Sequence, residues 1–153
     1  MRLRQRAQHV FGALALSGWS ALGCCPVAAE AMTACAAEQE ARGSIGACAA
    51  ACIAEDPGAI ALRAGPCLAA EADFWAQAAS SAMADLQRVL DSETLALVEQ
   101  GAAAFEGYRD AICAAESAAW PGMTGAGEAW AECRMQVTAQ HALRLESWLE
   151  ALE

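Results

Sequence analysis

Six cysteines constrain the fold of this chain more than any other feature of its sequence. They all follow residue 29 and are Cys35, Cys48, Cys52, Cys67, Cys113 and Cys133. An even number of cysteines in a short exported domain indicates a disulfide framework, because so small a core buries too little surface to be very stable alone. We therefore expect a small domain in which disulfides hold neighbouring elements together.

The first 29 residues are typical of a secretory signal peptide. Three arginines lie within the first six residues, an apolar run covers residues 10–23, and Val27 and Ala29 are the small residues that signal peptidase prefers. This pattern predicts cleavage before Glu30. The apolar run is too short to predict a membrane span.

The predicted mature domain covers residues 30–153 and is expected to be periplasmic or secreted. A second interpretation is a lipoprotein anchored at Cys24, although Ala21 stands where such a motif favours leucine. The mature domain has six arginines, no lysine and nineteen acidic residues, which gives a net charge of −13. This charge disfavours nucleic acid and anionic lipid as partners and attracts basic proteins. The alternative is that acidic residues only keep an alanine-rich protein soluble.

Alanine is abundant, strand-forming residues are scarce, and the apolar spacing is helical. We expect an all-α domain of about four helices. The predicted helices cover residues 30–54, 67–90, 92–120 and 128–153. Glu55 to Pro66 is expected to be a loop because it contains Pro-Gly and Gly-Pro. Asp91 or Ser92 is expected to cap the third helix.

Apolar residues recur at helical spacing in the last three predicted helices. They are Leu68, Trp75, Ala79, Met83, Leu86 and Leu90, then Leu95, Val98, Ala102, Phe105 and Ile112, and finally Trp130, Cys133, Val137, Leu145, Trp148 and Leu152. The tryptophans at positions 75, 120, 130 and 148 are expected to anchor the core.

Cys113 and Cys133 enclose the end of one predicted helix, the sequence "PGMTGAG" and the start of the next helix. Such a segment forms an antiparallel helix hairpin that brings the two sulfurs together. A disulfide that closes a loop of this length stabilises a fold by about 3 kcal/mol.

The other four cysteines allow two sets of disulfides. We favour Cys52–Cys67 across the loop and Cys35–Cys48 along the entry segment. The rival set joins Cys35 to Cys67 and Cys48 to Cys52, and in the latter pair a single helical turn gives awkward bridge geometry. Two thiols in the sequence "CAAAC" could instead bind a soft metal, but no histidine lies near them, so we expect no metal site.

Phe105, Arg109 and Cys113 are spaced four residues apart and therefore share one face of the third helix. An arginine on that face requires a carboxylate or carbonyl partner. We expect Arg109 and Asp110 to tie helices together beside the disulfide, and His141 to be a satisfied residue on a helix face.

This segment resembles the C-terminal half of the LprI-like lysozyme-inhibitor family. In that family, an aromatic residue, a Tyr/Phe-Arg-Asp triplet and a cysteine lie on one helix, before a bend, a second cysteine, a threonine and a basic residue. The matching positions are Phe105, Tyr108, Arg109, Asp110, Cys113, Glu116, Cys133, Thr138 and Leu145, with His141 as the basic residue. Phe105 replaces the family's tryptophan, and Ala102 replaces its glutamine.

The resemblance implies a periplasmic protein that binds and inhibits lysozyme, or another basic envelope protein. Arg63, in the predicted loop, is a candidate to contact the two carboxylates of the lysozyme cleft. The alternative is a non-inhibitory envelope module. We expect no enzyme activity, catalytic residues or cofactor, because the sequence has no phosphate-binding loop, nucleophile elbow or metal-ligand cluster.

Overall fold

The computed structural model describes Cys35 and residues 44–55, 60–120 and 125–152. These residues form the helices α2 (Ala47–Ala54), α3 (Ile60–Val89), α4 (Ser92–Ala118) and α5 (Gly125–Glu150), and they contain no strand. The predicted all-helical fold class is therefore confirmed. No helix in these ranges combines the length and the apolar character needed to cross a membrane. The predicted signal peptide lies outside the described residues.

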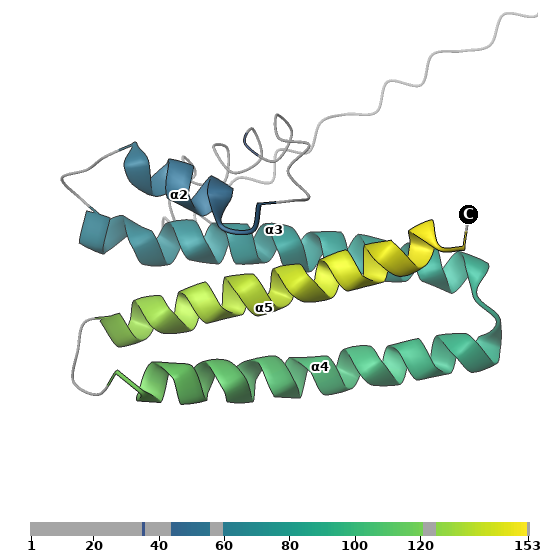
Figure 1. Ribbon diagram of the computed structural model, residues 1–153. Coiled ribbons are helices and arrows are strands. Elements are labelled where there is room, and N and C mark those ends of the chain that lie inside the picture. Colours follow the sequence, from purple (N-terminus) through teal and green to yellow (C-terminus); the bar gives the residue numbers. More distant parts are fainter. Residues whose placement is uncertain (1–34, 36–43, 56–59, 121–124, 153) are drawn as a thin grey trace, which may run out of the picture.

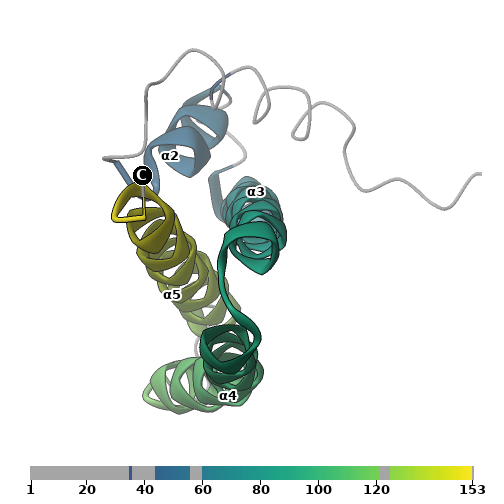
Figure 2. The same cartoon turned by 90° about the vertical axis from the view of Figure 1, so that its right-hand side faces the viewer.

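The long helices α3, α4 and α5 run antiparallel to their neighbours in sequence, and α2 lies against α3 (Figure 1). Helix α5 packs against both α3 and α4, whereas α3 and α4 meet mainly near the short turn that joins them. The end-on view shows α4 at one side of the molecule, beyond α5 (Figure 2). Helix α4 therefore depends on α5 for most of its tertiary packing.

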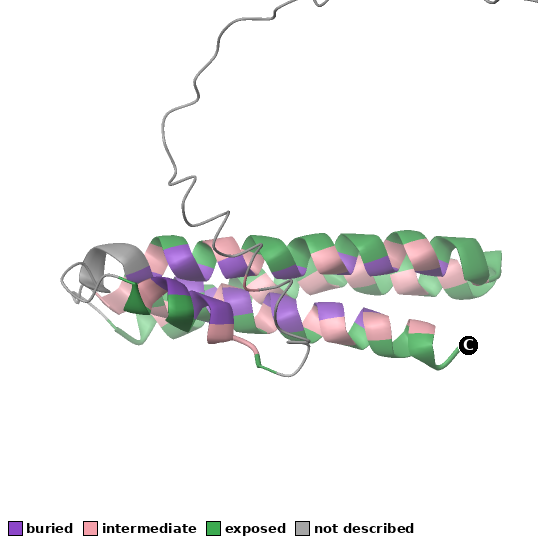
Figure 3. Ribbon diagram, turned by 90° about the horizontal axis from the view of Figure 1, so that it is seen from above, coloured by how far each residue is buried: buried purple, intermediate pink, exposed green. Residues whose placement is uncertain are grey.

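The core lies mainly between α3 and α5, where buried positions follow the facing sides of the helices (Figure 3). The α3 stripe predicted from the sequence is confirmed, since Leu68, Trp75 and Leu86 are buried and Met83 packs against the same cluster. Helix α5 contributes Ala131, Met135, Ala139, Ala142 and Leu145. Alanines on this side allow the two helices to approach closely.

Three of the four tryptophans expected in the core are instead substantially exposed. Trp75 is buried, but Trp120, Trp130 and Trp148 are not. The stripe predicted on α5 is confirmed in part: Cys133 and Leu145 are buried, but Trp130 and Trp148 are exposed. Most of the predicted stripe is therefore displaced around the helix from the stripe that the core uses. The physical reason is that the alanine side of α5 packs against α3, which leaves the bulky side chains at the edges of the interface.

The start of α3 differs from the prediction. Residues 60–66 are helical, so the expected loop from Glu55 to Pro66 is wrong over this part, and Arg63 lies on a helix. Pro66 is the seventh residue of α3, after the first turn. Local signals predicted a break there, but Ala64 and Leu68 on either side of Pro66 belong to the core. Burial of these residues outweighs the backbone hydrogen bond that proline cannot donate.

The first predicted helix is also shorter within the described residues. Its last part is α2, and Ser44 to Gly46 lie outside the helix. Gly46 adopts φ 89°, a left-handed conformation that favours glycine. The rest of the predicted range, apart from Cys35, lies outside the described residues.

The predicted start of the third helix is confirmed. Asp91 is the N-cap of α4, and its carboxylate accepts hydrogen bonds from the backbone N–H groups of Glu93 and Thr94 at 3.0 and 2.9 Å. The bond from Thr94 N–H is the main cause that lowers the pKa of Asp91 below its usual 3.8. These bonds satisfy two of the donors that a helix N-terminus leaves unpaired.

The disulfides are Cys35–Cys48, Cys52–Cys67 and Cys113–Cys133, the set that the sequence favoured over its rival. The Cα atoms in these pairs are 5.8, 5.9 and 5.4 Å apart, within the usual range for disulfides. The second disulfide joins α2 to α3, and the third joins α4 to α5.

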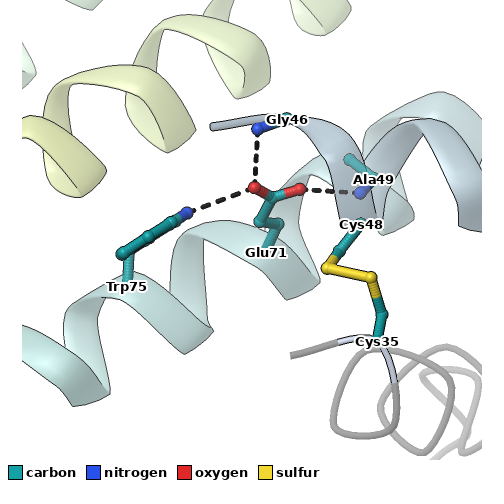
Figure 4. Close-up of a disulfide and its surroundings, with 6 residues drawn as sticks. All are labelled: Cys35, Gly46, Cys48, Ala49, Glu71 and Trp75. Atoms are coloured by element: carbon teal, nitrogen blue, oxygen red, sulfur yellow. Dashed lines mark hydrogen bonds between the residues drawn. A yellow bond between two sulfur atoms is a disulfide. The ribbon is translucent and has the colours of Figure 1, made fainter. Parts of the chain in front are cut away.

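A buried glutamate on α3 provides a second attachment for α2 (Figure 4). Glu71 is only 1% exposed, and its two carboxylate oxygens accept hydrogen bonds from Gly46 N–H at 2.7 Å and Ala49 N–H at 2.6 Å. The indole Nε1–H of Trp75 donates a further bond at 3.2 Å. Gly46 is the N-cap of α2 and has no side chain to cap the helix.

Glu71 therefore replaces a local cap with one from another helix. In a capping box, one side chain accepts a hydrogen bond from the N–H of the third helical residue, and a second side chain accepts one from the N–H of the N-cap residue. Ala49 is the third residue of α2, so the single carboxylate of Glu71 serves both positions. Its negative charge also lies where the dipole of α2 favours an anion.

Candidate functional site

The candidate site is a groove between α3 and α4, with α5 as its floor. It encloses about 360 Å³, within the range typical of ligand-binding clefts. We call it the α3–α4 groove. Its lining residues are Ala76, Ala79, Ser80, Met83, Ala84 and Gln87 from α3, Ala102, Phe105, Glu106 and Arg109 from α4, and Thr138, His141 and Leu145 from α5. The groove exists because α3 and α4 both pack on α5 and scarcely contact each other.

The groove brings together several of the residues that match the family motif. Phe105 and Arg109 come from α4, and Thr138 and His141 come from α5. The rings of Phe105 and His141 are stacked, with centroids 3.9 Å apart and planes inclined by 10°. This stack is a contact between α4 and α5 in addition to the Cys113–Cys133 disulfide.

Two further motif residues, Tyr108 and Asp110, do not line the groove. Tyr108 is 60% exposed, and Asp110 is also exposed. Arg109 Nε and Nη2 lie 2.9 and 2.8 Å from the same oxygen of Asp110. This ion pair lies within α4, so it does not tie two helices together as we expected from the sequence. Helix-to-helix contact is provided by Phe105 and His141 instead.

His141 is half-buried, and this burial lowers the pKa of its imidazole below the usual 6.5. The charged residues that line the groove opposite it are Glu106 and Arg109. With its pKa lowered, the imidazole is neutral at neutral pH. The Phe105–His141 stack is then an uncharged aromatic surface.

We expect His141 to make the domain less stable as the pH falls through the region below 6.5. Because the folded pKa is below the unfolded value, the unfolded chain binds more protons there, and stability decreases as the pH falls. Urea denaturation of wild type and His141→Gln between pH 7.5 and pH 5 measures this effect. Since His141 is the sole histidine after residue 29, the variant should lose this part of the pH dependence. Equal slopes for both proteins would contradict the prediction.

Among the remaining predicted site residues, Cys48 and Cys52 do not line the groove. Arg63 lies in the first turns of α3, and its side chain is outside the described part of the structure. Cys48 and Cys52 are both in disulfides, so they offer no thiolate for the soft metal considered above. Among the described residues, no group of three or more metal-ligating side chains comes together.

Sequence reasoning missed the α3 wall of the groove and Glu106. Ala76, Ser80, Ala84 and Gln87 form an exposed, uncharged side of α3, next to the core residue Ala79, which also lines the groove. Their spacing of three or four residues is a signal for a shared face. The sequence alone gives no reason to expect that α4 leaves this face uncovered.

Comparison of the chain with protein-family models, curated proteins and solved structures found no match. The resemblance to the LprI-like family thus depends on the motif residues themselves.

Proposed function

We propose that this chain is an exported binding protein that holds lysozyme in the α3–α4 groove and inhibits it by contact. The observation that carries the proposal is the convergence of Phe105, Arg109, Thr138 and His141 on one open groove. These are residues to which the family resemblance assigns importance. Three disulfides suit an oxidising compartment outside the cytoplasm, where lysozyme acts.

Charge supports a basic partner. The mature domain carries a net charge of −13, and common lysozymes are basic. Opposite charges accelerate association and lose much of this effect in salt, because the Debye length falls to about 8 Å at physiological ionic strength. Binding through this charge is therefore expected to be fast at low salt and weaker at high salt.

The second candidate function is a non-inhibitory envelope module that binds another basic protein. The observation that favours it is the helical conformation of residues 60–66, which removes most of the loop that was expected to enter the lysozyme cleft. Without that loop, this protein has no described segment that would enter the lysozyme cleft, and its α3–α4 groove would instead accept a protruding part of the partner. Inhibition would then require the bound domain to block the entrance of the lysozyme cleft.

The test uses the protein exported by a bacterial host and purified from its periplasm. We expect it to bind lysozyme in calorimetry and to slow the clearing of a cell-wall suspension. Ser80→Trp should weaken binding at least about tenfold, because a bulky side chain at this exposed groove position excludes the partner. Gln77→Trp is the control, since Gln77 is exposed on the same helix and does not line the groove.

The possible results separate the two functions. Binding with undiminished clearing would support the non-inhibitory module and exclude inhibition. If lysozyme does not bind at all, lysozyme is the wrong partner. Equal loss of binding in both tryptophan variants would place the contact outside the groove.

A further inference from the structure

Glu106 is a charged residue of the groove that is left without a partner among the described residues. It lines the α3–α4 groove and is exposed, and neither an ion pair nor a hydrogen bond engages its carboxylate. The arginines of α3 and α4 whose side chains are described are each paired with a nearby aspartate, Arg88 with Asp85 and Arg109 with Asp110. Glu106 therefore has no cation of its own helices to neutralise it.

The charge of Arg109 is already offset inside α4. Its Nε and Nη2 both point at one oxygen of Asp110, at 2.9 and 2.8 Å, and its side chain is 17% exposed. Besides His141, the groove lining has one acidic side chain, Glu106, and one basic side chain, Arg109. With Arg109 paired and the imidazole neutral at neutral pH, the groove carries the negative charge of Glu106.

An aromatic surface lies next to this carboxylate. Phe105 and Glu106 both line the groove. The ring of Phe105 is stacked on His141 with centroids 3.9 Å apart, and the guanidinium carbon of Arg109 lies 6.0 Å from the Phe105 centroid. Alkyl stems of lysine and arginine pack well on apolar surfaces while their charged ends reach a polar partner. The faces of aromatic rings also attract cations within about 6 Å of a ring centroid. The small residues Ala76, Ser80 and Ala84 leave room opposite.

We propose that the α3–α4 groove is a subsite for an arginine or lysine side chain of the partner, with its cation at Glu106 and its stem over the Phe105–His141 stack. The charge of the whole domain is complementary to such a side chain. This inference rests on the proposed function for the identity of the partner. Its chemistry depends only on the residues of the groove.

The test titrates the exported protein, labelled with ¹⁵N, with N-acetyl-arginine amide and records backbone NMR shifts. We expect the largest shifts near Phe105, Glu106 and His141. Glu106→Gln should weaken the binding about fivefold, because it removes a charge–charge contact at a partly open site. Glu116→Gln is the matched control, because Glu116 lies on the same helix, is exposed and does not line the groove. It should leave the affinity unchanged.

Three results would overturn the inference. The first is shifts spread evenly over the acidic surface, and the second is equal effects of Glu106→Gln and Glu116→Gln. The third is a response to N-acetyl-glutamate amide but not to the arginine amide, which would assign an anion site at Arg109. Because the probe is not lysozyme, the subsite and the lysozyme proposal fail separately. Localised arginine binding without lysozyme binding leaves the subsite in place and excludes only that partner.

Discussion

Replacing Glu71 with alanine is expected to destabilise the domain by about 3 kcal/mol or more, because each buried donor left without a partner costs about 1–3 kcal/mol. The substitution leaves the N–H groups of Gly46 and Ala49 and the indole N–H of Trp75 without their acceptor. It also opens a cavity at a position that is 1% exposed. Urea denaturation of the exported protein measures the loss.

Glu71→Gln tests the hydrogen-bonding role of the carboxylate while keeping the volume of the side chain. The amide has nearly the same shape, but it presents one acceptor oxygen and a donor NH₂ group, which cannot accept from the second backbone N–H. We expect a loss of stability between those of wild type and Glu71→Ala. Asp73→Asn is the control, since Asp73 is exposed on the same helix. If Glu71→Gln is as stable as the control, one acceptor is enough to cap α2.

Hydrogen exchange locates the effect of Glu71. Helix α2 is held by two disulfides, so losing its cap need not unfold the rest of the domain. The amide protons of Gly46 and Ala49 are expected to exchange faster in both Glu71 variants, while amides in the core of α5 change less. Uniformly faster exchange throughout the domain would instead show that α2 unfolds together with the long helices.

Removing the Cys113–Cys133 disulfide is expected to destabilise the domain by about 3 kcal/mol, through the greater freedom of the unfolded chain. The double variant Cys113→Ala and Cys133→Ala suits the site, because both side chains are buried and an alanine adds no polar group. Helix α4 should be affected first, since it packs mainly on α5. Denaturation and hydrogen exchange of α4 measure the two effects.

The matched control for this variant is Cys52→Ala with Cys67→Ala, which opens a loop of similar length between α2 and α3. It should cost a comparable free energy but leave exchange in α4 unchanged. If both double variants loosen α4 equally, the Cys113–Cys133 disulfide does not have the specific role in holding α4 that the packing indicates.

Much of the fold was predictable because its signals are local. The N-cap at Asp91 is a local signal, because its carboxylate accepts from the backbone N–H groups only two and three residues later in the chain. The α3 stripe from Leu68 to Leu86 follows from helical spacing. The sequence favoured the observed disulfide pairing over its rival, because a bridge between Cys48 and Cys52 within one helical turn has awkward geometry.

The start of α3 and the exposed tryptophans were not predictable, because they depend on contacts between helices. Pro66 is a local signal for a helix end, and packing of Ala64 and Leu68 in the core overrides it. Trp130 and Trp148 have the spacing of core residues, but the alanine side of α5 forms the closer interface with α3. Spacing identifies candidate faces of a helix, and only the neighbouring helix decides which face is buried.

By itself, the sequence determined that this chain forms helices joined by three disulfides, since helix propensity, capping and loop closure act over short stretches of chain. The tertiary structure alone decided that Glu71 caps another helix from 22 residues away. It also decided that Phe105 and Arg109 line a groove with Thr138 and His141, because α3 and α4 both pack on α5 rather than on each other. Such sites depend on the relative positions of whole helices, and short-range spacing does not determine those positions.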